Sequence, residues 1–285
     1  MKTYEMRAEL FSLVKDVTFS GSHNPDDLRD ESLHPREREP LAVARPRSTE
    51  EVVALVRWAA RNEVPITPRG SGTGLSGGAV PVNGGLVIAF DQMRDVVSVN
   101  ERDHVAVVQS GITLRELNEA LAGTGLHYPV YPGELSGSLG GNVNTNAGGM
   151  RAVRHGVTRQ HVLGLEVVLA DGTVMKTGGP VMKTSSGYDL TQLLIGSEGT
   201  LALVTAVTLK LSPVLAHSAT LLVPFAGVHE VASVVPTLIS SGLMPSLLEY
   251  LDSTTLNALQ GSSELRLGVN PAIAEQSAAY LIVVL

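Results

Sequence analysis

Hydrophobic residues recur at helical spacing in the stretch 45–65, where valines, leucines and alanines fall on one side of a helix. Ser48 precedes this run and Glu51 stands three residues later, which is the pattern of a capping box at a helix N-terminus. The same pairing of threonine with glutamate begins a second expected helix at 113–125. The first half of the chain therefore predicts helices with well-defined starts.

Apolar runs between turn residues predict the strands of a mixed fold. Residues 162–178 hold two such runs around Asp171-Gly172, the pattern of a β-hairpin. After Pro213 the order becomes strand, helix, strand, helix, strand, which predicts a second domain of the βαβ type. We expect its last strand, 278–285, to lack partner elements within this sequence. Further strands are expected at 84–90, 95–100, 104–111 and 201–213.

Three segments of small residues separate these elements, at 68–81, 133–149 and 196–200. The first contains G-x-G-x-x-G at 72–77, the pattern of a Rossmann dinucleotide site, in which a helix must begin directly after the glycines. More glycines and a proline follow instead, so we expect no helix there and reject the Rossmann interpretation. A flexible surface turn is the alternative interpretation of this segment.

The glycine density of the first segment indicates that something approaches its backbone too closely for side chains, because glycine is costly in ordered structure. Bare backbone N–H groups form a concavity that binds anions. The second segment adds asparagine amides, the third adds the Glu198 carboxylate, and Arg69 is placed to neutralise part of a ligand's negative charge. We expect the three segments to converge on a long polar anion, such as a nucleotide cofactor with a pyrophosphate.

Composition narrows the range of partners. The 21 Lys and Arg against 28 Asp and Glu give a formal net charge of −7, which argues against nucleic acid as a partner. Cysteine is absent, which excludes disulfides and thiolate chemistry, and no two of the 8 histidines have helical metal-ligand spacing. No metal site is expected. Without a signal-peptide or membrane-length apolar stretch, we expect a cytoplasmic protein, with peripheral membrane association left open.

Four motifs in order resemble the FAD-linked oxidase family, which is the vanillyl-alcohol oxidase or p-cresol methylhydroxylase superfamily. They are PRGSGTGLSGGAVP, GGNVNTNAGGMRAVRHGVTRQHVLGLEVVLADGTVMKTGG, SSGYDL and GSEGTLALVT. The branch they resemble most is that of the D-2-hydroxy-acid dehydrogenases, which includes D-lactate dehydrogenase, D-2-hydroxyglutarate dehydrogenase and a component of glycolate oxidase. The resemblance is strong over residues 40–212, and the four motifs together are far more specific than any one of them.

The resemblance implies an α+β fold of the p-cresol methylhydroxylase type. An FAD-binding domain over 1–213 would contain two α/β subdomains, about 40–110 and 111–213, with FAD extended between them. Residues 214–285 would begin a ferredoxin-like α/β substrate domain, or cap. In this branch the cap continues past the position of Leu285 and carries catalytic and metal-binding histidines, so the chain is expected to be C-terminally truncated.

By the same resemblance, the first segment wraps the FAD pyrophosphate, the second continues towards the isoalloxazine ring, and the third lies along the other side of the cofactor. The expected FAD-binding residues are Arg69, Gly70, Ser71, Gly72, Thr73, Gly74, Leu75, Pro132, Gly133, Gly140, Gly141, Asn142, Thr145, Asn146, Ala147, Gly148, Gly149, Gly156, Gly196, Glu198, Gly199 and Val204. Tyr188 is expected to pack near the flavin. Some relatives attach FAD through a histidine beside the first loop or through a cysteine; this chain has neither, so non-covalent FAD is expected.

The implied reaction is oxidation of a 2-hydroxy acid, with hydride transfer to flavin N5 and removal of the hydroxyl proton by a base. His155 is a candidate base, against a structural role for it, and Arg151 and Arg154 are candidate cations for the carboxylate. Electrons would pass to an electron-transfer protein, a quinone or oxygen, and a homodimer is left open. The alternatives are an FAD-binding fragment or pseudo-enzyme without turnover, a related oxidase of an alcohol or sugar, and a nucleotide-binding module without flavin.

Overall fold

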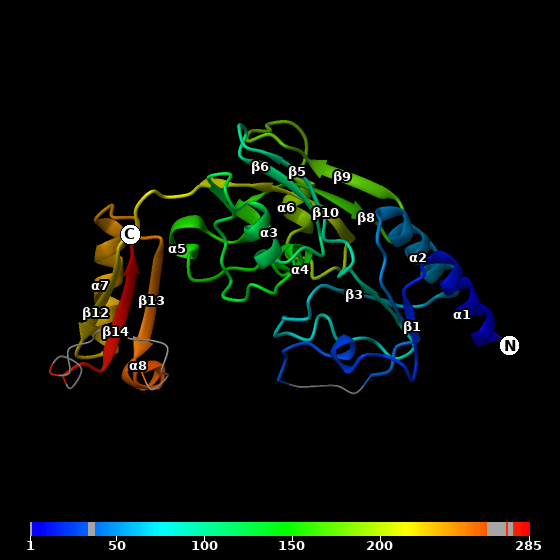
Figure 1. The fold of residues 1–285 in the computed structure, drawn as a ribbon, viewed down its shortest axis with the longest axis horizontal. Coiled ribbons are helices and arrows are strands. Elements are labelled where there is room, and N and C mark those ends of the chain that lie inside the picture. Colours follow the sequence, from blue (N-terminus) through cyan, green and yellow to red (C-terminus); the bar gives the residue numbers. More distant parts are fainter. Residues whose placement is uncertain (1, 34–37, 261–271, 273–275) are drawn as a thin grey trace. The chain divides into compact units, whose positions relative to one another are not determined.

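The structure is a computed structural model that describes residues 2–33, 38–260, 272 and 276–285. The chain divides into two compact units (Figure 1). Unit 1 consists of Met1–Tyr128, Glu134–Ala147 and Thr158–Val214, and unit 2 consists of Pro129–Gly133, Gly148–Val157 and Leu215–Leu285. The domain limits expected from the sequence, 1–213 and 214–285, did not include the two short excursions of the chain into unit 2.

The first sheet of unit 1 is mostly parallel. Its strands run in the order β1-β2-β4-β3, with β1 antiparallel to β2 and the other neighbours parallel. These strands are β1 Val17–Phe19, β2 Ala42–Ala44, β3 Ile66–Arg69 and β4 Leu86–Ala89, and the helices beside them are α1 Lys2–Leu13, α2 Thr49–Asn62 and the 3-10 helix η1 Pro25–Leu28. Because β2, β3 and β4 are parallel, their C-terminal ends share one edge of the sheet, where the first small-residue segment begins.

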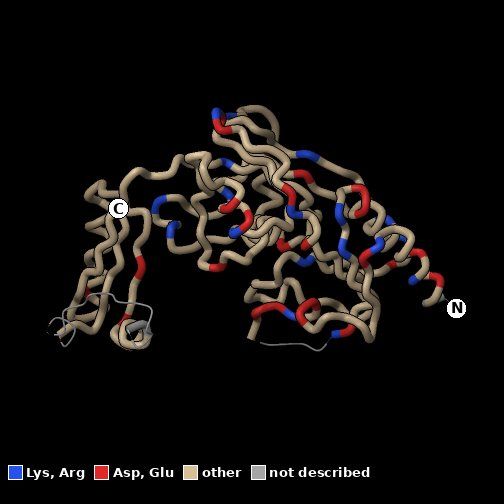
Figure 2. Tube along the Cα trace, viewed as in Figure 1, with Lys and Arg blue, Asp and Glu red and all other residues tan. Residues whose placement is uncertain are grey.

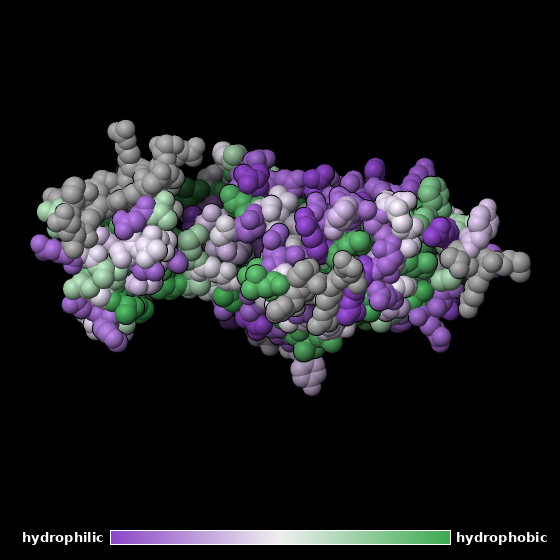
Figure 3. Space-filling view, turned by 90° about the horizontal axis from the view of Figure 1, so that it is seen from below, coloured by the Kyte–Doolittle hydropathy of each residue, from purple (hydrophilic) through white to green (hydrophobic). Residues whose placement is uncertain are grey.

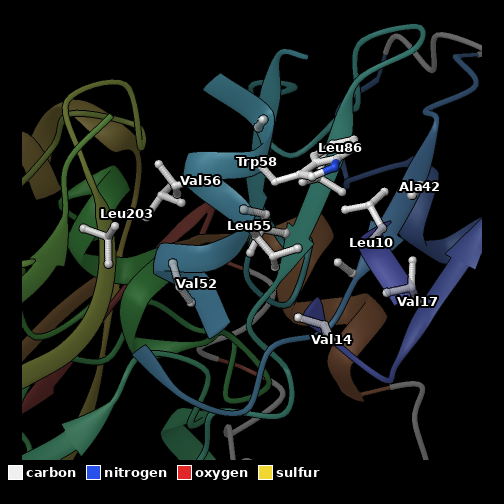
Figure 4. Close-up of a cluster of buried hydrophobic side chains, with 14 of the residues drawn as sticks. Leu10, Val14, Val17, Ala42, Val52, Leu55, Val56, Trp58, Leu86 and Leu203 are labelled. Carbon is white, nitrogen blue, oxygen red and sulfur yellow. The ribbon is translucent and has the colours of Figure 1, made fainter. Parts of the chain in front are cut away.

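Helix α2 connects the core of the first sheet with the second sheet. Ser48 caps it by accepting a hydrogen bond from Glu51 N at 3.3 Å, as predicted, whereas the Glu51 carboxylate accepts from Arg47 N and leaves the capping box open. Trp58 is fully buried and lies over Leu86 of β4 in Figure 4. Val56, on another side of the helix, faces Leu203 from the second sheet (Figure 4).

The second sheet of unit 1 is antiparallel, with strands in the order β5-β6-β10-β8-β9. They are β5 Val96–Asn100, β6 Val105–Gln109, β8 Val162–Val168, β9 Val174–Gly178 and β10 Leu203–Lys210. The β8–β9 hairpin confirms the turn predicted at Asp171-Gly172, where Gly172 has a φ of 79°. The expected subdomain limit near residue 110 cuts through this sheet, because β6, which lies before the limit, pairs with β10, which lies after it.

Short elements lie between the strands of the second sheet and directly after its last strand, β10. Helix α3 begins with the predicted capping box, in which Thr113 N donates to Glu116 Oε2 at 2.9 Å and Glu116 N donates to Thr113 Oγ1 at 3.2 Å. A small ladder pairs β7 with β11. The connecting elements are α3 Leu114–Ala120, β7 Leu126–His127, α4 Leu139–Thr145, η2 Thr158–Gln160, α6 Leu190–Leu194 and β11 Ser212–Pro213.

Unit 2 contains a three-stranded antiparallel sheet in the order β12-β14-β13. Its elements are α5 Ala152–His155, β12 Thr220–Phe225, α7 Val228–Ser240, β13 Leu247–Asp252, α8 Ser253–Gln260 and β14 Ala279–Val284. The predicted order of strands and helices is confirmed. The expectation that the last strand lacks partners is wrong, since β14 pairs along both edges. Its residues Leu281 and Val283 pack with Val231 of α7 in the core of this unit.

On the face shown in Figure 3, hydrophobic residues appear singly or in small groups between hydrophilic ones. None of the helices among the described residues combines the length and hydrophobicity needed to cross a membrane. The features that call for an explanation are therefore the small-residue segments of unit 1.

Candidate cofactor site

The first segment follows Arg69 as an irregular loop, and no helix begins within residues 70–85. The rejection of the Rossmann interpretation is confirmed. Across the described part of the chain, the backbone N–H groups of residues 70–78 donate no hydrogen bond to a protein acceptor. Such a run of unused donors on a half-exposed loop forms an anion-binding concavity.

The glycines of this loop are required for different reasons. Gly72 has a φ of 75°, and an ideal Cβ placed on it would lie 2.7 Å from Cζ of Arg69. The space beside Gly72 is therefore filled by the protein, which corrects the expectation that a ligand excludes side chains throughout the loop. Gly74 differs, because a Cβ placed there would meet no atom within 4 Å. Of these two glycines, only Gly74 has open space beside its backbone that a ligand could occupy.

Arg69 is 7% exposed, and its guanidinium is held by a neighbouring segment. Its Nη1 donates to Arg29 O at 2.7 Å and its Nη2 donates to Asp26 O. Burial lowers the pKa of the Arg69 guanidinium, against the opposing charges of Asp27, Asp30 and Asp26. The sequence predicts that the Arg69 guanidinium faces a ligand, but two of its nitrogens donate hydrogen bonds within the protein.

The second segment is a helix where a loop was expected. Ser138 caps α4 by accepting from Gly141 N at 3.3 Å. Gly140 N donates to Ser110 O at 2.7 Å, and Leu139 N donates to Ile112 O at 2.8 Å. The backbone N–H groups of Gly140 and Gly141 are therefore both used within the protein, and the prediction that these glycines bind FAD stays a prediction. The short, side-chain-poor helix instead packs closely on Ser110, since a Cβ on Gly140 would lie 2.7 Å from the Cβ of Ser110.

The third segment is fastened to α4 and lies against the first. Gly196 N donates to Val143 O and Glu198 N donates to Asn144 O, both at 2.9 Å. A Cβ on Gly199 would lie 2.5 Å from Cγ of Pro68, and one on Gly78 would lie 3.1 Å from Oε2 of Glu198. The structure thus brings together three segments that are far apart in the sequence.

A pocket of about 420 Å³ opens between the first and third segments. Its walls are mainly apolar and come from α2, β3 and the ends of β8 and β10 as well as from both segments. Its lining residues are Val56, Ile66, Thr67, Pro68, Gly78, Val80, Val82, Val168, Leu169, Ala170, Glu198, Gly199, Thr200, Leu201, Ala202 and Leu203. A pocket of this size accepts a ring system or another flat organic group.

Buried polar atoms near the segments also lack partners. Within the described residues, Asn142 Nδ2 and Asn144 Oδ1 are buried and make no hydrogen bond. The whole Asn142 residue is only 7% exposed, so water has little access to it. Buried polar groups are normally satisfied, so these atoms are places where a ligand would complete the hydrogen bonding. Unused amides, unsatisfied side-chain atoms and an apolar pocket together fit a cofactor with a pyrophosphate and flat rings, such as FAD.

The remaining predicted residues of unit 1 have structural contacts. Thr145 Oγ1 donates to Gly141 O at 3.0 Å, and Asn146 ends α4 in the left-handed conformation while its Oδ1 accepts from Arg159 N at 3.0 Å. Val204 lies in β10 opposite Val167 of β8. Tyr188 is 97% exposed, so no described residue of the chain packs over it. Its place near the flavin stays a prediction.

The other predicted residues belong to unit 2, except Ala147, which is the last residue of a unit 1 segment. Gly149 lies against the carbonyl of Tyr131, and Gly148 lies against Val157, so both are tightly packed. Arg151 stacks over the ring of Tyr131 at 5.4 Å from its centroid. His155 is in α5 and has interactions within the protein. The roles predicted for Pro132, Gly133, Ala147, Gly156, Arg154 and His155 stay predictions.

Sequence reasoning did not identify several residues that build the site. Ser110 and Ser138 support α4 and the first segment, and both are buried. Residues 24–31, which hold Arg69, have no pattern that points to the loop 40 positions later. The polar residues around these segments do not form a metal centre, since the described residues contain no cluster of histidine and carboxylate side chains suited to a metal ion.

Residues 40–178 match a protein family described as FAD binding domain. The chain carries an FAD-binding domain. The match includes the first and second segments, whose unused donors and unsatisfied asparagines are described above. FAD is therefore the cofactor that both the family and the local chemistry support, and the resemblance to FAD-linked oxidases is confirmed.

Relatives of this FAD-binding domain protein are FAD-linked oxidoreductases and hydroxy-acid dehydrogenases. An uncharacterized FAD-linked oxidoreductase of Mycobacterium tuberculosis is 51% identical over 99% of this chain and 62% of its own length. Glycolate oxidase subunit GlcD of Bacillus subtilis is 41% identical over 80% of this chain and 49% of its own. D-lactate dehydrogenase of Anaerostipes hadrus is 40% identical over 84% and 50%. The chain thus spans about half to three fifths of these relatives.

Solved structures confirm the fold. Alkyldihydroxyacetonephosphate synthase superposes with a TM-score of 0.86, covering 99% of this chain and 55% of its own, at 21% identity. At this identity the likeness concerns the architecture alone. It confirms the α+β fold class expected from the sequence.

Proposed function

We propose that the chain is the FAD-binding part of an oxidoreductase that oxidises a 2-hydroxy acid, with D-lactate, glycolate and D-2-hydroxyglutarate as candidate substrates. The observation that carries the proposal is the meeting of three segments around unused hydrogen-bond donors, and two of these segments lie in the region that matches an FAD binding domain. The names of a glycolate oxidase subunit and of a D-lactate dehydrogenase among the relatives support the substrate class.

When bound, FAD supplies the acceptor for the hydride that leaves the hydroxyl-bearing carbon of the substrate. In this proposal the N–H groups of residues 70–78 bind the pyrophosphate, which presents negative oxygens to otherwise unused donors. Asn142 donates through Nδ2, whose burial without a partner makes a hydrogen bond there favourable. The apolar pocket between the first and third segments shields from water the part of the cofactor that enters it.

The binding is proposed to be non-covalent. The chain contains no cysteine, and residues 68–81 contain no histidine, so the side chains that commonly form a bond to the flavin are lacking in this loop. Affinity must then come from hydrogen bonds and burial, which makes the backbone conformation of residues 70–78 decisive for holding the cofactor.

The test is to purify the full chain, record its visible spectrum, and titrate it with FAD while following flavin fluorescence. We expect saturable binding with a flavin absorption spectrum, and complete release of FAD on denaturation. Failure to take up FAD would refute the proposal. Each candidate acid is then added without oxygen to the loaded protein. Bleaching of the flavin band identifies the substrate, whereas FAD uptake without bleaching by any acid would favour a binding fragment without turnover.

A further inference from the structure

The guanidinium of Arg69 lies under the first segment and is bonded to backbone on its other side. Its two terminal nitrogens donate to Arg29 O and Asp26 O. The same group lies against the backbone of Gly72, because an ideal Cβ there would come 2.7 Å from Cζ and 2.9 Å from Nη1. Arg69 therefore fills the layer between the loop and the segment Asn24–Glu31.

The segment Asn24–Glu31 is itself fixed to the sheet. Asp27 accepts from Arg45 Nη2 at 2.6 and 2.7 Å, and Arg45 Nε donates to Asp91 at 3.0 Å. Arg45 directly follows β2, and Asp91 follows the end of β4. Figure 2 shows acidic and basic residues close together in this N-terminal part of the chain. The segment Asn24–Glu31, which accepts the hydrogen bonds of Arg69, is thus anchored to the ends of the parallel strands β2 and β4.

A second contact joins this support to the loop. Glu31 N donates to Gly74 O at 3.0 Å, two residues beyond the contact of Arg69 with Gly72. Both contacts leave the N–H groups of residues 70–78 without protein acceptors. The side chain and the segment therefore hold the loop in place without using its donors.

The local charges match this arrangement. Asp27, Asp30 and Asp26 lie near enough to Arg69 to raise the pKa of its guanidinium, against the lowering by burial. These carboxylates, all from the segment Asn24–Glu31, partly offset the positive charge of Arg69. A phosphate on the loop would meet a guanidinium whose charge and donors are already partly compensated.

Resting on the proposed function, we infer that Arg69 is a positioning residue for the FAD pyrophosphate. It fixes the backbone of Gly72–Gly74 against Asn24–Glu31 and keeps the loop donors free, and it does not act by neutralising the phosphates. The sequence had suggested direct neutralisation. The two roles predict opposite effects when a nearby negative charge is removed, and that difference makes the inference testable.

The decisive variant is Asp27→Asn. If Arg69 attracts the phosphates by charge, removing a carboxylate behind it strengthens binding of FAD. If Arg69 positions the loop, replacing the Asp27–Arg45 ion pair by a weaker neutral hydrogen bond loosens its support and weakens binding. We expect the FAD dissociation constant to rise by about tenfold, since a hydrogen bond between charged groups contributes more than a neutral one. Asp103→Asn, an exposed carboxylate in the β5–β6 turn, is the matched control and should leave the constant unchanged.

Arg69→Lys gives an independent measurement. Lysine keeps the charge but lacks the planar fork that reaches both carbonyls, so we expect a similar rise of about tenfold, without rescue by the retained charge. Dissociation constants are measured well below the melting temperature of each apoprotein, because loss of global stability alone lowers that temperature without changing affinity in the folded protein.

The outcomes are distinct. Weaker binding in Asp27→Asn and Arg69→Lys, with unchanged binding in Asp103→Asn, supports the positioning role. Unchanged or tighter binding in Asp27→Asn, or normal binding in Arg69→Lys, overturns it while the proposed function stands. A wild-type chain that takes up no FAD overturns the proposed function, and the inference about Arg69 with it.

Discussion

Alanine at position 72 would place a methyl group where the protein leaves no room. The φ of Gly72 is 75°, and the new Cβ would lie 2.9 Å from Nη1 of Arg69. The buried guanidinium moves only by giving up its bonds to Arg29 O and Asp26 O. Alanine in the left-handed region costs about 1–2 kcal/mol and a charged hydrogen bond contributes about 1.5–3 kcal/mol. We expect Gly72→Ala to lower the free energy of unfolding of the apoprotein by about 2.5–5 kcal/mol.

Gly74→Ala is the matched comparison in the same loop. Gly74 has no positive φ, and a Cβ there meets no atom within 4 Å. Alanine should leave the stability of the apoprotein unchanged or raise it by up to about 1 kcal/mol, because it restricts the unfolded chain. Its effect should appear on the cofactor instead. If FAD lies along this backbone, the added methyl group weakens FAD binding without weakening the fold.

Urea unfolding of both apoproteins, followed by circular dichroism, measures the first effect, and titration with FAD measures the second. The expected result is a less stable Gly72→Ala variant beside a stable Gly74→Ala variant that binds FAD more weakly than the wild type. Equal stability of Gly72→Ala and the wild type would show that Arg69 does not constrain this backbone. Normal FAD binding by Gly74→Ala would show that the cofactor does not use the open side of the loop.

Three further results are expected. Burial raises the pKa of Glu166, but hydrogen bonds from Thr49 and Thr205 and the charge of Lys176 outweigh it, so the net pKa is lowered. The Glu166 carboxylate therefore stabilises the fold above pH 4.5, and this stabilisation is lost as pH falls through the lower folded-state pKa. Glu166→Gln should therefore lower the urea midpoint at pH 7 and converge with wild type in acid. Leu55→Ala, in the core, should destabilise by about 2–5 kcal/mol, against less than about 0.5 for Val97→Ala, which is 61% exposed. Acid precipitation of the loaded protein should leave all flavin in the supernatant; flavin in the pellet would contradict non-covalent binding.

Local signals in the sequence were sufficient for much of the fold. Ser48 and Thr113 cap their helices because the side-chain oxygen and the amide three residues later are fixed by local geometry. The hairpin at Asp171-Gly172 needs only a glycine that adopts positive φ. The strands of unit 2 were found from apolar runs alone, but their order was not. The pairing of β14 between β12 and β13 depends on contacts across the whole unit.

The candidate site shows a sharper limit. Helix α4 consists largely of glycine, asparagine and threonine, which disfavour helices, and tertiary contacts of its first amides with Ser110 and Ile112 override that propensity. The partner of Arg69 was also hidden, because the acceptors are backbone carbonyls of Asp26 and Arg29. Every residue has such a carbonyl, so no residue type in the sequence marks it.

The central position of β14 has a consequence for the order in which unit 2 forms during synthesis. Strands β12 and β13 pair with β14 and not with each other, although β14 is the last of the three along the chain. A ribosome releases β12, α7 and β13 before the strand that joins them exists, so their edges stay open for that time. Unit 2 thus depends on late, long-range pairing, and during this interval the open edges of β12 and β13 expose the nascent chain to aggregation.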